Sequence, residues 1–452
     1  MIALRMIAPI LTGFTTVAGA GDRDPASYRA VWTNADARLE DLRGRPGIAA
    51  IRLNHLEENG RKSLYSSIET DSLPRAAQLV TVQMDPAAGK WPAAPAWLSA
   101  VDEVTVEVYA HGVSLMEISL LLEEPPEEGR EDWLDRMQGE AVGYAEELGE
   151  LILADVMKPL LDALAEADPK SGTFHLEAAD ATPPRVLWVS RSLLVDQANR
   201  NLLLHWTKDS VDDASAHLRD ELQAGSRHSL VRWLNYGFVD VDGVGAAALR
   251  TGRHAAEFSG LRYAQETYAS LDVVDSRLRL VLADAAAAST KWELEQLRGD
   301  LVWLSLRAEL IIMGRHELGK YMTRAVRAHF DRIMDGWDYE VLIEEPARFK
   351  IELCNRRLDD LAARRAARSG RVTDLILMGI GITSIASIAL AISQFGRSAA
   401  SDPLATGYDL GASDFTSWFA AQPVDVILLA SAAASAVLVV LYLYFRRDDG
   451  AS

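Results

Sequence analysis

The sequence predicts an α/β N-terminal domain, followed by long stalk helices and a two-helix transmembrane hairpin, which makes an α+β membrane protein. Three observations lead to this prediction. Strand and helix patterns alternate through residues 21–250, helical patterns alone follow from about residue 262, and two apolar stretches lie near the C-terminus. The predicted limits are 1–255 for the α/β domain, 256–371 for the helical stalk, and 372–447 for the hairpin with its basic tail.

Length and composition narrow the classes of function. The chain has 452 residues, which is too long for a single ordinary core. Its net charge of −19 argues against nucleic acid as a partner, because a phosphate backbone attracts basic surfaces. Cys354 is the single cysteine, so the chain can hold neither an internal disulfide nor a zinc site built from several thiolates.

The first twenty residues allow two interpretations. The stretch "MIALRMIAPILTGFTTVAGAG" has an early arginine, an apolar run and small residues at its end, as a signal peptide does. Cleavage there would export the N-terminal domain and leave the basic stretch 356–371 outside the cell, which the distribution of charge disfavours. We therefore expect residues 1–20 to form a first strand or a loosely ordered lead.

The N-terminal domain is expected to mix strands and helices. β-Branched residues around a glycine turn predict strands in 103–122, and apolar residues at helical spacing predict a helix over 133–167 that Pro159 kinks. Further strands are expected at 184–195 and 228–243, with a helix at 209–225 between them. This alternation is typical of an α/β domain.

Three long helices are predicted for the stalk. The first covers 261–289, and the second covers 292–334 with a bend near Gly314 or Gly319. The third begins after Pro346 and has no further proline before residue 393, so it can run unbroken into the first apolar stretch. A helix of that length needs partners along its sides, either from its own chain or from further copies.

Hydropathy predicts membrane spans at 372–394 and 424–445. Basic residues flank both stretches, whereas the connecting loop is acidic apart from Arg397. The expected cytoplasmic basic flank consists of Arg364, Arg365, Arg368, Arg371, Arg446 and Arg447. The positive-inside rule then predicts a multi-pass inner-membrane protein with both termini and the large domain in the cytoplasm.

No stretch of the sequence presents a catalytic constellation. "GVGAAA" at 243–248 resembles a dinucleotide fingerprint, but no βαβ pattern follows it, so a plain turn is favoured. The serines of "SRS" at 190–192 lie near His205 without a glycine elbow around them. The acidic run "EEPPEEGRED" reads as a solvated loop rather than a cation site. We therefore expect a protein that is not an enzyme.

A polar stripe runs along the first apolar stretch. The stripe consists of Leu377, Gly381, Ser384, Ser387, Ala391 and Gln394, which lie at alternating steps of three and four residues. Close packing of helices explains the glycine and the serines. A pore that several copies enclose explains Gln394 as well, and the stripe is then the predicted pore lining.

This organisation resembles the CorA family of magnesium transporters. The resemblance rests on "LDVVDSRLRLVLADA", on "FKIELCNRRLDDLAARRAARSGRVTDLILMGI" and on "LYLYFRRDDG", which look like the paired stalk helices and the end of the second membrane helix. It implies a homopentamer in membrane lipid whose first membrane helix lines the pore. It also implies a divalent cation such as Mg²⁺ as substrate or regulator, with no other cofactor.

The chain departs from the family at the outer mouth. The family carries Gly-Met-Asn there, whereas this chain has Gln394, Phe395, Gly396 and Arg397. Phe395 and Gly396 match the aromatic residue and the glycine of the family, but the Met and the Asn are missing. A ring of arginines would repel cations, which argues against magnesium selectivity.

Three functions follow as expectations. The leading one is a CorA-like homo-oligomeric ion channel or transporter, which the cytoplasmic domain gates in response to a small-molecule regulator. The alternative is a membrane effector of a bacterial defence system that senses a nucleotide messenger and perturbs the membrane. The third is a membrane-anchored scaffold without a pore.

Overall fold

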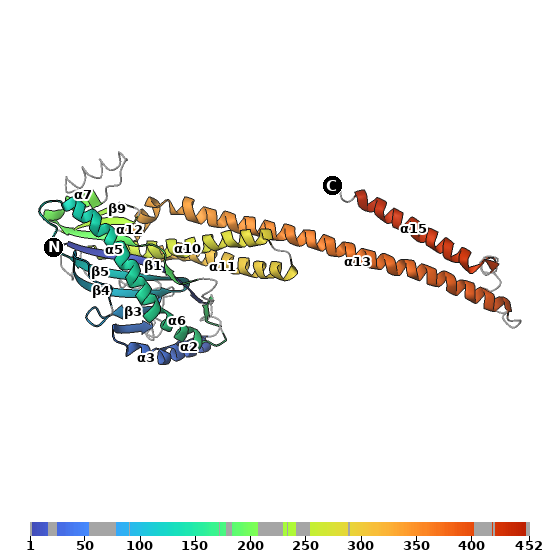
Figure 1. Cartoon of the computed structure of the whole chain (residues 1–452), viewed down its shortest axis with the longest axis horizontal. Helices are drawn as coiled ribbons and strands as arrows, with labels where there is room; N and C mark the ends of the chain where they lie inside the picture. Colours follow the sequence, from blue (N-terminus) through green and yellow to red (C-terminus); the bar gives the residue numbers. More distant parts are fainter. Residues whose placement is uncertain are drawn as a thin grey trace. The chain divides into compact units, whose positions relative to one another are not determined.

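The computed structural model covers the chain as two compact units, Met1–Asn355 and Arg356–Ser452. The residues that it describes are 2–16, 25–53, 78–89, 91–170, 172–177, 183–206, 229–232, 234–240, 254–287, 290–401, 418 and 421–448. Figure 1 shows the elements of both units along the chain.

The first unit is built on a mixed sheet whose ten described strands run in the order β2-β3-β4-β5-β1-β8-β10-β9, with β6 and β7 also paired to β1. The strands are β1 Ile2–Thr16, β2 Ile48–Leu53, β3 Gln78–Met84, β4 Leu98–Tyr109, β5 His111–Leu122, β6 Phe174–Leu176, β7 Arg185–Val186, β8 Ser190–Asp196, β9 Ser229–Arg232 and β10 Asn235–Asp240. Neighbouring strands are antiparallel except β8 and β10, which are parallel.

The helices of the first unit lie before, between and after the strands. They are α2 Pro25–Arg38, α3 Glu40–Arg43, α5 Arg130–Ile152, the π-helix η1 Leu153–Met157, α6 Lys158–Ala167, the 3₁₀ turn η2 Gln197–Asn199, α7 Leu202–Trp206, α10 Ala255–Ala287, α11 Lys291–Tyr321, α12 Arg324–Gly336 and the π-helix η3 Glu340–Glu344. Two helices reach the second unit, namely α13 Glu345–Ser401 and α15 Val424–Asp448. The α/β character predicted for the N-terminal region is confirmed.

The first strand lies at the centre of the sheet. β1 pairs with β5 on one side and with β8 on the other, and almost all of its side chains are buried. The prediction of a first strand within residues 1–20 is therefore confirmed. The predicted strand pair 103–122 is also confirmed, since β4 and β5 form a hairpin that turns at Ala110, and Gly112 at the start of β5 has a φ of 81°.

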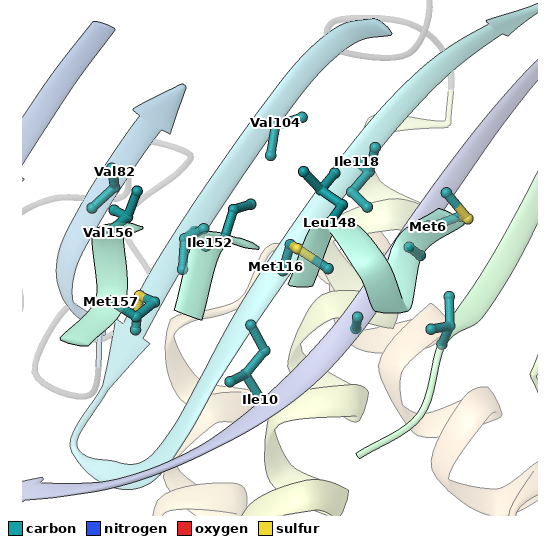
Figure 2. Close-up of a cluster of buried hydrophobic side chains, with 14 of the residues drawn as sticks. Met6, Ile10, Val82, Val104, Met116, Ile118, Leu148, Ile152, Val156 and Met157 are labelled. Atoms are coloured by element: carbon teal, nitrogen blue, oxygen red, sulfur yellow. The ribbon is translucent and has the colours of Figure 1, made fainter. Parts of the chain in front are cut away.

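Alternation along the strands separates two buried faces. Met6 and Ile10 of β1 lie on the face that α5 and η1 cover, together with Met116 of β5 (Figure 2). Arg5 and Leu11 lie on the opposite face, where Leu11 packs with Ala269 and Val273 of α10. The sheet is thus enclosed by α5, η1 and α6 on one side and by α10 on the other (Figure 1).

Two predicted helices are interrupted. The helix expected at 133–167 divides into α5, η1 and α6, and Pro159 lies in the first turn of α6, where a proline costs no backbone hydrogen bond. The helix expected at 292–334 ends at Tyr321 and restarts at Arg324. The Thr323 side chain caps the new helix by accepting from the Val326 amide, so the break falls there rather than at either of the predicted glycines, Gly314 and Gly319.

The long third helix is confirmed, because α13 continues without a break from Glu345 to Ser401. The transmembrane hairpin is not. None of the helices, as far as their residues are described, has the combined length and apolarity of a membrane span. A span needs roughly 20 consecutive, predominantly apolar residues, whereas Asp374, Thr383, Ser384 and Ser387 interrupt 372–394, and Asp425, Ser431 and Ser435 interrupt 424–445. The predictions of a hairpin and of a multi-pass inner-membrane protein are therefore contradicted.

Candidate ligand site

Buried charges fix α10 against the sheet. Arg262 of α10 donates to Glu107 of β4 at 3.0 Å, and Tyr109 donates to the same carboxylate at 2.6 Å. Beside them Arg5 Nε donates to Glu117 of β5 at 2.6 Å. Burial works against the charge on Arg262, but Glu107, Tyr263, Glu117 and Tyr109 together outweigh it, and the pKa of Arg262 rises well above its ordinary value. This charged layer sets the rotation of α10 and so determines which of its residues face away from the sheet centre.

A cavity of about 250 Å³ lies along the next turns of α10. Six residues line it, namely Trp188, Leu234, Gln265, Tyr268, Asp272 and Trp337, and we call it the aromatic cavity. Gln265, Tyr268 and Asp272 lie at helical steps of three and four residues, so they share one face of α10. The other residues come from the segment before β8, from the turn between β9 and β10, and from the end of α12.

Three of the wall residues are aromatic, and the rings of Trp188 and Trp337 are both nearly perpendicular to that of Tyr268. The ring of Tyr268 is 5.8 Å from that of Trp188, with an interplanar angle of 88°. It is 5.4 Å from the ring of Trp337, with an angle of 82°. Such edge-to-face pairs are favourable, and they hold the rings in fixed positions. The walls are therefore rigid, and their faces point in different directions.

The polar end of the cavity is also held in place. Trp188 Nε1 donates to Gln265 Oε1 at 2.6 Å, and the Gln265 side chain is fully buried. Burial raises the pKa of the neighbouring Tyr236 hydroxyl well above its ordinary value.

Asp272 brings a carboxylate to the cavity wall. Burial raises its pKa above the ordinary value, and the nearby Asp275 adds to the rise, while Arg279 and Lys350 oppose it. Within the described residues Asp272 makes neither a hydrogen bond nor a salt bridge of its own. A half-buried carboxylate without such a partner favours a positively charged or hydrogen-bonding ligand.

The cavity is connected to the start of α13. Asp275, one turn beyond Asp272 on α10, accepts a hydrogen bond of 2.6 Å from Lys350 Nζ of α13. The thiol of Cys354, one turn further along α13, is buried and lies 3.8 Å from the carbonyl oxygen of Leu278. A change of charge at Asp272 therefore acts directly on the pair that joins α10 to α13.

A second hollow, of about 630 Å³, lies between α11 and the first turns of α13. Its lining includes Met313, His316, Arg348 and Glu352, all of which are exposed. Arg348 forms a salt bridge of 3.1 Å with Glu344 and stays largely in solvent. Exposed, flexible walls fix a ligand less well than buried rings, so the aromatic cavity is the stronger candidate.

The residues predicted to line a pore lie in α13, where all of them are exposed, namely Leu377, Gly381, Ser384, Ser387, Ala391 and Gln394. Of the predicted outer mouth, Phe395, Gly396 and Arg397 also lie in α13. Arg397 is exposed, and its Nη2 donates to the Gln422 carbonyl oxygen at 2.8 Å. Thr383 donates to the carbonyl oxygen of Ile380 at 2.9 Å, which satisfies its hydroxyl within the helix.

The predicted basic flank divides between two helices. Arg364, Arg365, Arg368 and Arg371 belong to α13, and Arg446 and Arg447 belong to α15. The positions of their side chains lie outside the described part of the structure. The predicted role of these arginines as a basic flank is therefore not tested by the structure.

The other motifs take structural roles where they are described. Ser190 and Ser192 are buried in β8, and Ser190 donates to the Ile7 carbonyl oxygen at 3.0 Å. His205 lies 2.8 Å from Asp135 of α5. The stretch 243–248 and the helix expected at 209–225 lie outside the described residues. In the described part of the chain no group of three His, Cys, Asp or Glu side chains could hold a metal ion.

Comparison with known proteins gives no information about the function, which is therefore inferred from the geometry of the candidate site. No family model, no curated protein and no solved structure matches this chain. The resemblance to CorA transporters therefore stays a prediction.

The aromatic cavity was not among the sites predicted from the sequence. One signal was present, because Gln265, Tyr268 and Asp272 interrupt the apolar face of the predicted helix 261–289 at helical spacing. The other walls could not be found from the sequence, since Trp188 and Trp337 are distant in the chain and meet α10 only through the tertiary fold.

Proposed function

We propose that this chain is a ligand-responsive regulatory protein that carries out no reaction itself. Its α/β unit binds a small molecule in the aromatic cavity, and the start of α13 responds. The observation that carries the proposal is the link between Asp272 in the cavity wall and the pair Asp275–Lys350. The proposal agrees with the expectation from the sequence that the N-terminal domain responds to a small-molecule regulator. Ion transport stays an untested prediction.

The response follows from electrostatics. Asp272 and Asp275 repel each other, and Lys350 is shared electrostatically between them. A ligand that neutralises Asp272 leaves Lys350 to pair with Asp275 alone, which strengthens the attachment of α13 to α10. A ligand that repels Asp272 has the opposite effect. Binding of a ligand in the cavity thus changes how firmly the first turns of α13 are attached to α10.

Hydrogen exchange tests this proposal. Fragments that bind the protein are found by ligand-observed NMR and sorted by whether Trp337→Leu abolishes their binding. A fragment that binds in the cavity should change the exchange rate of amides 345–355 in the native protein. The same fragment should bind Lys350→Met without that change. If no fragment depends on Trp337, or if exchange at 345–355 never responds, the proposal fails.

A second candidate function, assembly into a homo-oligomer, is favoured by the apolar surface of the second unit. Leu377, Ile380 and Ile388 of α13 are each more than half exposed, as are Leu429 and Val437 of α15. Nothing lies within 4 Å of where a Cβ would stand on Gly379 or Gly381, so another helix has room to approach there. Exposed apolar residues in such numbers mark an interaction surface, and copies of one chain are the commonest partners.

The assembly is tested by molar mass. Light scattering on the purified native chain should give a multiple of the monomer mass of 49.5 kDa. Ile380→Glu together with Leu429→Glu should shift it toward the monomer. Leu342→Glu, at a similarly exposed position of η3 in the first unit, serves as the matched control and should leave the mass unchanged. A native chain that is monomeric at all concentrations would remove this candidate.

A further inference from the structure

We propose that the aromatic cavity binds the alkylammonium group of a small organic cation. This inference rests on the proposed ligand-binding function and adds the chemical class of the ligand. It is carried by three features of the cavity, namely its crossed aromatic rings, its carboxylate and the absence of basic side chains from its described lining.

The rings provide the apolar part of the recognition. Trp188 and Trp337 both stand nearly perpendicular to Tyr268, so the three rings do not form one stack. The face of an aromatic ring carries partial negative charge and attracts a cation, tryptophan most strongly.

The carboxylate provides the charge. Asp272 is half-buried in the same wall and has no hydrogen bond or salt bridge within the described residues. The nearby cations Lys350 and Arg279 act on Asp272 electrostatically, but both form their salt bridges with Asp275. A bound ammonium group would add a counter-charge in direct contact with Asp272, close to aromatic rings that exclude water and strengthen the attraction.

The same features disfavour a phosphate-bearing ligand. None of the six lining residues is a lysine, an arginine or a histidine. A phosphate group would meet the carboxylate of Asp272 with no basic side chain among the lining residues, and like charges at close range repel. The nucleotide messenger expected as an alternative from the sequence is thus a poor fit to this cavity.

The volume is right for a small head group. The aromatic cavity measures about 250 Å³. An apolar cavity of about 150 Å³ is known to hold benzene, so a trimethylammonium group of similar bulk fits with room for a short attached chain. Gln265, held at the far wall by Trp188, is the polar group available to such a chain.

The test compares ligands that have the same shape and differ in charge. Tetramethylammonium and choline are titrated into the full-length protein by calorimetry at constant ionic strength. The neutral isostere 3,3-dimethylbutan-1-ol is titrated in parallel. The cations should bind, and choline should bind at least about tenfold more tightly than its isostere, which corresponds to roughly 1.4 kcal/mol.

Four variants locate the binding and identify its cause. Asp272→Asn and Tyr268→Leu should each weaken the binding of choline by about tenfold, because one removes the charge and the other removes a ring face. Tyr268→Phe keeps the ring and should bind nearly as the native protein does. Asp284→Asn, at an exposed position of α10, changes the net charge equally and should have no effect.

Each outcome has a distinct meaning. Equal binding of choline and its isostere, lost in Tyr268→Leu, would overturn the cation class and leave the proposed ligand-binding function standing. If choline binds Asp272→Asn and Tyr268→Leu as tightly as the native protein, the cation binds elsewhere and the inference is overturned. If neither these probes nor any fragment from the NMR screen binds in the cavity, the inference and the proposed function fail together.

Discussion

Lys350 of α13 donates from Nζ to Oδ2 of Asp275 on α10 across 2.6 Å, although the two residues are 75 positions apart in the sequence. The Asp275 side chain is 8% exposed and that of Lys350 is 22% exposed, so the pair is largely removed from water. Arg279 approaches the same carboxylate at 3.5 Å but is 61% exposed. The pair with Lys350 is therefore the principal ionic connection that the structure describes between α10 and the start of α13.

Lys350→Met should destabilise the first unit by about 2–3 kcal/mol, because it leaves Asp275 buried with only a partly exposed arginine as partner. Chemical denaturation measures this change. Arg279→Met should cost less than about 1 kcal/mol, as solvent-exposed pairs do. The double variant Asp275→Asn/Lys350→Met should recover part of the loss. Equal losses for Lys350→Met and Arg279→Met would show that burial of the pair is unimportant.

Glu266 should make stability depend on pH. Burial raises its pKa from 4.5 to about 7, against hydrogen bonds from Ser270 and Thr267 that favour the charged form. The folded protein thus binds more protons than the unfolded chain between these values, so stability falls as pH rises through that window, by on the order of 3 kcal/mol. Glu266→Gln keeps an acceptor for Ser270 and should flatten the dependence. An identical pH profile for both proteins would contradict this assignment.

Gly112 should tolerate no side chain. Its φ is +81°, and an added Cβ would stand 2.3 Å from Arg307 Nη2, which donates to the His111 carbonyl oxygen. Gly112→Ala should therefore strain the backbone and displace the buried side chain of Arg307. Together these effects should lower the free energy of unfolding by about 2–3 kcal/mol. Gly129 has a similar φ of +72° but open space around it. Gly129→Ala measures the strain alone, and thermal unfolding of the two variants should differ clearly.

Binding of choline to the aromatic cavity should weaken in acid. Choline keeps its charge at every pH, so the dependence reports on the protein. The pKa of Asp272 lies above its ordinary value because of burial and of Asp275, with Arg279 and Lys350 opposing. As pH falls through that raised pKa, Asp272 gains a proton and loses its attraction for the cation. Calorimetry from pH 7 downward should show the loss in native protein and little change in Asp272→Asn.

Much of the fold could be predicted from local patterns. The hairpin of β4 and β5, the helical character of residues 255–336 and the unbroken course of α13 from Glu345 to Ser401 all follow from residue types at short spacing. Local patterns were less reliable at the ends of elements. The break between α11 and α12 occurs where Thr323 caps the second helix. Glycine usually disfavours helix more than threonine does, yet α11 continues through both Gly314 and Gly319.

The transmembrane hairpin shows where hydropathy alone was insufficient. The prediction treated 372–394 and 424–445 as membrane spans, and the described helices contain no span of that kind. The candidate site, in contrast, is a feature that the structure contains and the sequence did not predict. The sequence contained Tyr268 and Asp272 on one helix face, but nothing local marked Trp188 and Trp337 as their neighbours.

By itself the sequence determined the α/β class of the N-terminal region and its long helices, because period, β-branching and turn residues act over a few positions. It also determined the acidic net charge and the absence of an internal disulfide. Only the tertiary structure decided which faces meet. The charged layer of Arg262 and Glu107 sets the rotation of α10, and that rotation brings Tyr268 and Asp272 to two distant tryptophans. Such contacts depend on side chains 65 to 155 positions apart, and no local pattern encodes them.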